Sequence, residues 1–426
     1  MRFSTPWLLA ITVQHAYTIA IPDPAISTTQ ESSKTTIPPV PLKPTNPELT
    51  QTPAATAHKT PDPPGAAPRR IDLPSPHKTP NAKRVKIRSG PYKIPDMTVI
   101  GSPYGDKGTL FNLPDTSIER PCEGECTVLT QQAGLEYPNG TNANIDSGLW
   151  LHHMVTFIKG PGRWDPTCYG KPSGPHFAVG ATGSTSERMM ASGNERAFLD
   201  YSTNPEGSGY HFKQTDKLAY LVDLMNMNMQ ANVVYVTMVY DYLEGPLPPG
   251  WLDVKTVWLD AFQCGTSEVA PPKQNGAFTV SSKPWKPNFE GKILGGMGHL
   301  HDGGVEVDTM AGPNTAMCSQ DIPYSEKPEF KWSGKMAGDD KPADDHISSM
   351  PQCKIQAVTE LKKDQSWTVE GKYDYDKRSG NLEGGKQSNV MAISLVFVGV
   401  PPGGVSKPPG WFGRRETRIL RSPMRE

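Results

Sequence analysis

The sequence predicts an all-β protein with two antiparallel β-sandwich domains of jelly-roll type in tandem. Short runs of branched and aromatic residues recur along the chain, and several alternate polar with apolar residues, as strands do. Clusters of Gly, Pro, Asn and Asp separate the runs, and many short strands with frequent turns favour sandwiches or barrels. In chain order the runs are GLWLHHMVTFI, NVVYVTMVYDYL, VKTVWLDAFQC, SWTVEGKYDY and VMAISLVFVGV. Only the stretch DKLAYLVDLMNMN can be read as a long amphipathic helix.

Length and turn signals suggest where the domains divide. A chain of 426 residues has room for two or three domains. The segment EGPLPPG, residues 244–250, is a natural seam, so we expect one domain over residues 89–245 and another over 246–400. Each is long enough to bury a core of its own. A basic tail rich in Pro and Gly, residues 401–426, follows the second domain.

The N-terminal region is typical of a secreted protein. Residues 1–20 carry one basic residue, a short apolar stretch and small residues near Ala20, which predicts a signal peptide. Residues 21–88 are dense in Pro, Thr, Ser and Lys, so we expect a disordered linker, or a propeptide removed at Lys83–Arg84. The net charge of −1 argues against a nucleic-acid partner, and no segment is apolar enough for a membrane span. We expect an extracellular monomer.

Six cysteines in a secreted chain favour disulfides over free thiols. Three fall on each side of the seam, so either one bridge crosses between the halves or each half keeps a free thiol. We expect the pairs Cys126–Cys168 and Cys318–Cys353. The sequon at Asn139 predicts an N-glycosylated surface loop.

Two histidine clusters are the strongest chemical signal. His152 and His153 are adjacent in LHHM, whereas His299 and His301 are two residues apart in GHLHDGG, and Met391 follows in a late strand. Imidazole and thioether donors together favour copper, above all Cu(I). Residues at i and i+2 share a face of a strand, so His299 and His301 can hold one ion. The adjacent pair can share an ion only where a bulge redirects one ring.

These motifs resemble the copper type II, ascorbate-dependent monooxygenases, which include the peptidylglycine α-hydroxylating and dopamine β-monooxygenases. The resemblance rests on LHHMVTF, GHLHDGG and EGGKQSNVMAISLVFVG, and covers roughly residues 120–400. It is greater still to secreted fungal proteins and plant stress-upregulated nodulin-like proteins. The resemblance implies one copper at His152 and His153, a second copper at His299, His301 and Met391, and ascorbate or another external reductant.

The departures from that family also carry information. The family takes a third ligand for the first copper from a strand that here reads LVDLMN, residues 221–226, without a histidine. Met225, Asp223 or His211 from a neighbouring strand are the alternatives; otherwise that site has two ligands. In the peptide hydroxylase, polar residues hold the substrate carboxylate. Here the matching positions are apolar, so peptidylglycine is not the expected substrate; they are Met297, Ile393 and Leu395.

Several of these residues also have an ordinary structural explanation that involves no metal. Met391 alone would be core packing, and Met225, Met227, Met229 and Met238 fit alternation on a buried face better than a copper relay. We expect structural or exposed roles for His176, His211 and His346. Asp302 either supports an imidazole or begins a turn.

Two functions follow from these observations. The first is a copper-dependent monooxygenase that oxidises a C–H bond of an unidentified small-molecule or cell-surface substrate. The second is a non-catalytic copper-binding or cell-surface protein that keeps the fold and one metal site. Chemistry other than hydroxylation on the same site, such as oxidative coupling, stays open.

Overall fold

The regular structure of the described residues consists almost entirely of β-strands, which form four sheets. The computed structural model describes residues 59–103, 105–171, 174–332, 334, 345–353, 358–403 and 405. The short helices among them are η1 (Ile145–Ser147), α2 (Gly174–Ala178) and η2 (Pro328–Phe330). Among the described residues no helix is long and apolar enough to cross a membrane. The predicted all-β sandwich class is confirmed, and β9 (Lys217–Asn226) occupies the stretch that resembled a helix.

The largest sheet has 11 strands and takes strands from both halves of the chain. Its order is β1-β2-β10-β4-β8-β11-β21-β14-β17, with β7 beside β4 and β12 beside β21. Most neighbours are antiparallel, but β8 and β11 are parallel. The bounds are β1 (Arg70–Leu73), β2 (Lys83–Ile94), β4 (Cys126–Glu136), β7 (Phe198–Asp200), β8 (Ser208–Phe212), β10 (Asn232–Glu244), β11 (Leu252–Asp260), β12 (Glu268–Val269), β14 (Gly291–Leu300), β17 (Glu360–Leu361) and β21 (Val390–Val400).

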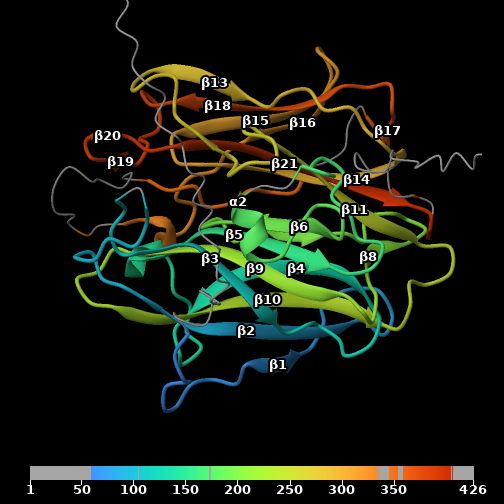
Figure 1. Cartoon of the computed structure of the whole chain (residues 1–426), viewed down its shortest axis with the longest axis horizontal. Coiled ribbons are helices and arrows are strands. Elements are labelled where there is room, and N and C mark those ends of the chain that lie inside the picture. Colours follow the sequence, from blue (N-terminus) through green and yellow to red (C-terminus); the bar gives the residue numbers. More distant parts are fainter. Residues whose placement is uncertain are drawn as a thin grey trace, which may run out of the picture. The chain divides into compact units, whose positions relative to one another are not determined.

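Two four-stranded antiparallel sheets pack with the large one (Figure 1). The first has the order β3-β9-β5-β6, and comprises β9 with β3 (Thr109–Ile118), β5 (Leu149–Lys159) and β6 (Ser186–Ser192). The second has the order β13-β18-β15-β16, and comprises β13 (Ala277–Ser281), β18 (Trp367–Asp374), β15 (Gly304–Ala311) and β16 (Ala316–Asp321). A two-stranded hairpin completes the set, with β19 (Leu382–Glu383) and β20 (Lys386–Gln387).

The buried side chains of these sheets form one main core. Every residue of β21 is buried, as expected for a central strand covered on both faces. Val257 and Trp258 of β11 and Val396 and Phe397 of β21 belong to the same cluster as Tyr220 of β9. Apolar contacts are therefore continuous between strands of the two predicted halves. The division into domains at residue 245 stays a prediction.

The predicted disordered segment is wrong for the part that the structure describes. Residues 70–73 and 83–88 belong to β1 and β2, which pair with each other and, through β10, with the large sheet. The abundance of proline hid a short alternation in which Val85 and Ile87 point into the core. Arg84, half of the dibasic pair, forms a 2.6 Å ion pair with Asp241. The signal peptide, residues 21–58 and residues 406–426 lie outside the described residues.

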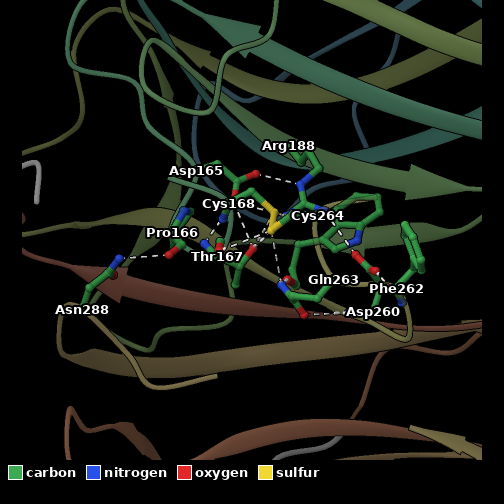
Figure 2. Close-up of a disulfide and its surroundings, with 11 residues drawn as sticks. Asp165, Pro166, Thr167, Cys168, Arg188, Asp260, Phe262, Gln263, Cys264 and Asn288 are labelled. Atoms are coloured by element: carbon green, nitrogen blue, oxygen red, sulfur yellow. Dashed lines mark hydrogen bonds and ion pairs between the residues drawn. A yellow bond between two sulfur atoms is a disulfide. The ribbon is translucent and has the colours of Figure 1, made fainter. Parts of the chain in front are cut away.

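The disulfides differ from the expected pattern. Cys126 bonds to Cys122, and Cys168 bonds to Cys264, so the predicted Cys126–Cys168 pair is wrong. Figure 2 shows the second of these, which joins the segment after β5 to the loop after β11 and therefore crosses the seam. A spacing of four residues is enough for the short bridge. The third bridge is the expected Cys318–Cys353.

Asn139 lies in an exposed turn after β4. Its side-chain Oδ1 accepts hydrogen bonds from the backbone N–H of Thr141 at 3.0 Å and from the Thr141 hydroxyl at 2.7 Å. The turn is open to solvent, as a glycosylation site requires. The sugar itself stays a prediction.

Candidate metal centre

A β-bulge places the adjacent histidines on one side of β5. The pairing of β5 with β9 shifts register between Leu151 and His153, so that Leu151 lies opposite Leu224 and His153 opposite Asp223. His152 is the extra residue in this bulge. Its ring lies against the ring of His153, with centroids 3.9 Å apart. The condition that two adjacent histidines impose, a bulge that redirects one of them, is therefore met.

The two histidine clusters meet in the folded chain. His153 Nε2 lies 2.7 Å from His301 Nε2, and the rings of His299 and His153 have centroids 5.7 Å apart. Ligating nitrogens of His152, His153 and His301 all lie within 4.8 Å of one another. The resemblance implied one site for each half, whereas the structure brings side chains of both motifs together. The number of ions they hold stays a prediction.

Hydrogen bonds at Nδ1 orient two of the rings. His301 Nδ1 lies 2.6 Å from the backbone oxygen of Asn389, and His299 Nδ1 lies 3.2 Å from Oε1 of Glu195. Both partners can only accept, so Nδ1 carries the proton in each ring and Nε2 keeps its lone pair. Metal-binding histidines are commonly held in this way. His299 Nε2 is buried and has no hydrogen-bond partner.

Crowding keeps the central rings neutral. Burial, followed by the charge of neighbouring imidazoles, lowers the pKa of His153 well below its usual value and that of His301 to about 3. Burial would also lower the pKa of His152, but the carboxylate of Asp223, 3.7 Å from Nδ1, raises it to about 9. Neutral imidazole is the form that binds metals. Two of the rings are thus prepared for a cation, and His152 has to lose its proton first.

Met391 shares the surroundings of the cluster. It lies on β21, is 5 % exposed, and lines one cavity together with His153 and His299. The hydroxyl of Tyr373 accepts a hydrogen bond from the backbone N–H of His301 at 3.0 Å and donates one to the backbone oxygen of Met391 at 2.5 Å. Tyr373 therefore ties the backbone of both residues together. Ligation by the Met391 sulfur stays a prediction.

The three alternatives for a further ligand beside His152 and His153 lie at different places in the structure. His211 lies on β8, where its Nε2 is 3.5 Å from Glu125, and it is not part of the cluster. Met225 lines a larger cavity that also includes His152 and His301. Asp223 is nearest to His152, and its Oδ1 accepts a hydrogen bond from Thr109 at 3.1 Å. The methionine pattern is mixed, because Met238 is buried whereas Met229 is 68 % exposed.

His346 and His176 lie at the edge of the centre. His346 is buried beside Trp150, and its Nδ1 lies 2.7 Å from Oδ2 of Asp302, so Asp302 supports an imidazole. Asp302 also accepts a hydrogen bond from the backbone N–H of Ile347 at 3.0 Å. His176 lines the same cavity as His153 and stacks edge-on against Phe157.

Two cavities reach the histidines. One, of about 50 Å³, is lined by His153, His299 and Met391, and the other, of about 450 Å³, by His152 and His301. Both include Asp223 and Glu268, and burial raises the pKa of Glu268 to about 7. The larger cavity therefore gives small molecules access to the histidine cluster.

The donor set fits a copper ion. Two nitrogens that bind one ion at right angles, each about 2.0 Å away, are about 2.8 Å apart, and the two facing Nε2 atoms are separated by 2.7 Å. Imidazole suits copper in both oxidation states. The partnerless Nε2 of His299 lies outside the group of three but on the same side of the molecule, with its ring centroid 5.9 Å from that of His301. An orphaned buried nitrogen costs about 1–3 kcal/mol, which a bound cation would offset.

Sequence reasoning missed the residues that hold the rings. Glu195 follows β6 in a loop, accepts a hydrogen bond from the backbone N–H of Gly193 at 2.9 Å, and belongs to no recognisable motif. A Cβ on Gly193 would lie 3.0 Å from His299 Cε1, so this loop approaches the ring closely. Asn389 acts through its backbone oxygen, which no side-chain pattern can indicate.

Comparisons with known proteins point to copper chemistry. The chain is 27 % identical over 317 residues to the probable copper-dependent oxygenase M1 of a Phoma species, covering 74 % of this chain and 72 % of that protein. It is 29 % identical over 268 residues to the probable copper-dependent oxygenase clz3 of Cochliobolus lunatus, covering 62 % of this chain and 77 % of that protein. The chain is thus related to copper-oxygenase-like proteins.

The other comparisons add nothing to this relationship. No family model matches the chain. Among solved structures, the major capsid protein P2 of bacteriophage PM2 has a TM-score of 0.24 and 8 % identity, with 79 % of this chain and 99 % of that chain covered. A similarity of this size carries no argument.

Proposed function

We propose that the chain is a secreted copper-dependent oxygenase whose metal is held by His152, His153 and His301, with His299 as a fourth donor. The observation that carries this proposal is the convergence of imidazoles from β5 and from the β14 turn on one point. The names of the two related proteins agree with it. Three disulfides suit the proposed export from the cell.

Each residue has a definable task in this proposal. Glu195 and the backbone oxygen of Asn389 hold the protons of His299 and His301 at Nδ1 and so direct Nε2 to the ion. Asp223 stabilises the charged form of His152, which gives up a proton when a metal binds. Bound copper would supply electron transfer between an external reductant, such as ascorbate, and dioxygen. The substrate reaches the centre through the larger cavity, which is lined by His152 and His301.

A non-catalytic copper-binding protein is the second candidate. The closeness of three imidazoles, whose nitrogens all lie within 4.8 Å of one another, favours a single ion, whereas the resembling monooxygenases use two. A single ion with many protein ligands can serve storage or structure instead of turnover.

The first experiment measures copper directly. The purified chain, reconstituted and dialysed, is analysed for metal content and for nitrogen coordination by electron paramagnetic resonance. We expect bound copper in the wild type, at least tenfold weaker binding in His301→Ala, and no change in His211→Ala, because that side chain lies outside the cluster. Absence of bound copper in the wild type would exclude both candidates. Oxygen consumption with ascorbate, compared with His301→Ala, then separates oxygenase from binding protein.

A further inference from the structure

Three methionine side chains share the wall of the larger cavity with the indole ring of Trp150. Met97, Met225 and Met227 all line this cavity of about 450 Å³, which also reaches the histidine cluster. Trp150 and Met227 belong to a small apolar cluster, and Met97 and Met225 pack against it. The four side chains therefore belong to one contact cluster as well as to one cavity wall.

Backbone pairing brings these methionines together from separate segments of the chain. Met225 of β9 lies directly opposite Trp150 of β5. The backbone N–H of Met97 donates a hydrogen bond at 3.1 Å to the backbone oxygen of Asn228, the residue that follows Met227. The segment before β3 is thus tied to the turn after β9, and each of the two contributes methionines to the cavity.

The sulfur of Met97 is located by its contact with a glycine. A Cβ on Gly108 would lie 2.8 Å from Sδ of Met97. The next residue, Thr109, is the cross-strand partner of Met225. The Met97 sulfur therefore lies next to the β3–β9 pairing that holds Met225.

The chemistry of these side chains favours a soft cation. Thioether sulfur selects Cu(I) among the metals common in proteins, and the face of an indole ring attracts a cation. Methionine also fills gaps in apolar cores, as Met238 does in β10, where it is fully buried. Met97 and Met225 differ from Met238, because both are partly exposed and line a cavity.

The charge of the same cavity also favours a cation. Carboxylates outnumber cationic side chains among the described residues that line it, with Asp106, Asp223, Glu268 and Glu383 against Lys107 and His152. Burial raises the pKa of Glu268 to about 7, so this group is only partly ionised at neutral pH, and the balance stays negative. A negative cavity with apolar walls raises the local concentration of cations.

We propose that Met97, Met225 and Met227, beside the ring of Trp150, form a binding site for Cu(I) in the larger cavity. The ion would bind to the thioether sulfurs of this methionine site and keep its oxidation state. The same cavity continues to the histidine cluster, so the methionine site would hold copper on its way there. This last role rests on the proposed function, whereas binding of the ion by the methionines does not.

The test follows the methionine methyl groups of the full chain by nuclear magnetic resonance while Ag(I) is added. Ag(I) has the charge and softness of Cu(I) and is not oxidised in air. The methyl groups are isotopically labelled, and their signals are assigned with single replacements of methionine by leucine. We expect the three signals of the methionine site to shift on addition of Ag(I), and the signal of Met238 to stay in place.

Calorimetric titration with Ag(I) measures the affinity. The double variant Met97→Leu and Met227→Leu keeps the apolar volume but removes two sulfurs, so binding at the methionine site should weaken at least about tenfold. Met238→Leu is the matched control and should leave the affinity unchanged, because Met238 is buried away from the cavity. His301→Ala disrupts the histidine cluster and should leave the methyl shifts in place.

The outcomes distinguish this inference from the proposed function. Methyl signals of the methionine site that stay unshifted at saturating Ag(I) overturn the inference, and so does an equal loss of affinity in Met238→Leu. Shifts that disappear in His301→Ala would place the ion at the histidines and also overturn it. Should the double variant fail to fold, the wild-type titration decides by itself. A chain that binds copper at the histidines without these methyl shifts leaves the proposed function intact.

Discussion

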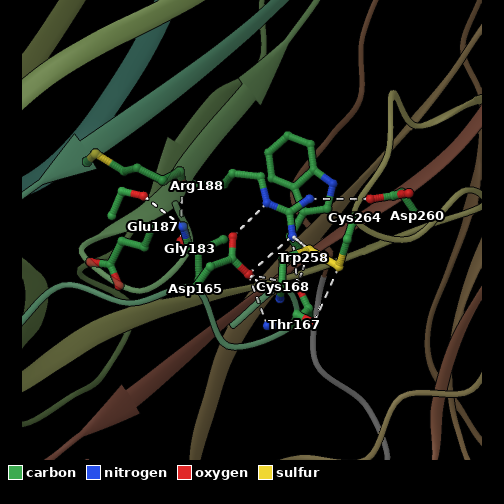
Figure 3. Close-up of polar contacts among 12 residues, drawn as sticks. Asp165, Thr167, Cys168, Gly183, Glu187, Arg188, Trp258, Asp260 and Cys264 are labelled. Atoms are coloured by element: carbon green, nitrogen blue, oxygen red, sulfur yellow. Dashed lines mark hydrogen bonds and ion pairs between the residues drawn. A yellow bond between two sulfur atoms is a disulfide. The ribbon is translucent and has the colours of Figure 1, made fainter. Parts of the chain in front are cut away.

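The buried guanidinium of Arg188 allows the most direct test of the energetics of this fold. Arg188 is 2 % exposed and lies 2.7 Å from Asp165 and 3.3 Å from Asp260. It also donates to the hydroxyl of Thr167 at 2.7 Å, and its guanidinium lies 4.7 Å from the ring centre of Trp258. Figure 3 shows these contacts converging on one side chain. Arg188→Met keeps much of the volume but removes the charge.

The expected loss follows from the groups left behind. Removing one partner of a buried ion pair costs about 3–5 kcal/mol, because the remaining charge is buried without compensation. We expect Arg188→Met to lower the free energy of unfolding by about 4 kcal/mol at pH 7. Arg378→Met is the control: Arg378 is 41 % exposed and lies 3.6 Å from Asp345, so its loss should cost about 1 kcal/mol or less.

The pH dependence gives a second readout. Burial would raise the pKa of Asp165, but the charge and hydrogen bonds of Arg188 hold it far below its usual value. In the wild type this contribution to stability is present above the unfolded pKa of about 3.9 and is lost as pH falls further. In Arg188→Met, burial raises the pKa of Asp165, and protonation relieves the penalty as pH falls from 7 towards 4.

Urea denaturation followed by tryptophan fluorescence measures both effects on the metal-free chain. The difference between wild type and Arg188→Met should shrink on acidification. A difference below about 1 kcal/mol at pH 7, or one that grows as pH falls, would refute the assignment of Arg188 as the neutralising partner of the two carboxylates.

Three further predictions concern the centre and the cross-links. Glu195→Gln should weaken copper binding about 10–100-fold, because a neutral amide is a weaker acceptor for the Nδ1 proton of His299 than a carboxylate. A competitive chelator titration measures the dissociation constant, and an unchanged value would exclude a role of Glu195 in orienting His299. Copper binding at pH 7 should release about one proton from His152, because Asp223 raises the pKa of His152 to about 9 against the effect of burial. Calorimetry in buffers of different ionisation enthalpy measures the number of protons released. The affinity for copper should fall as the pH is lowered. Replacing both cysteines of a bridge by alanine should cost roughly 5 kcal/mol for Cys168–Cys264 but roughly 2 kcal/mol for Cys122–Cys126, since the bridges close 96 and 4 residues; equal losses in urea denaturation would contradict this order.

Local pattern was sufficient for several of the long strands but not for β9, which resembled a helix, or for β2. The runs around His152, Met238 and Met391 alternate or fill with branched residues, and each became a strand. Composition misled at residues 70–88, because an average over many prolines conceals the two inward side chains of β2, Val85 and Ile87. The histidine motifs could also be recognised from the sequence, because two histidines within three residues are an uncommon pattern.

Only the tertiary structure shows that the two histidine motifs lie next to each other. His152 and His301 are far apart in the sequence, and their approach depends on the stacking of one sheet against another and on a bulge in β5. The residues that hold the rings, Glu195 and the backbone of Asn389, contribute through position alone. The sequence by itself determined most of the strands and the histidine motifs that are the proposed ligands. Long-range packing determined that both histidine motifs form one cluster, because contacts between distant strands leave no periodic trace in the chain.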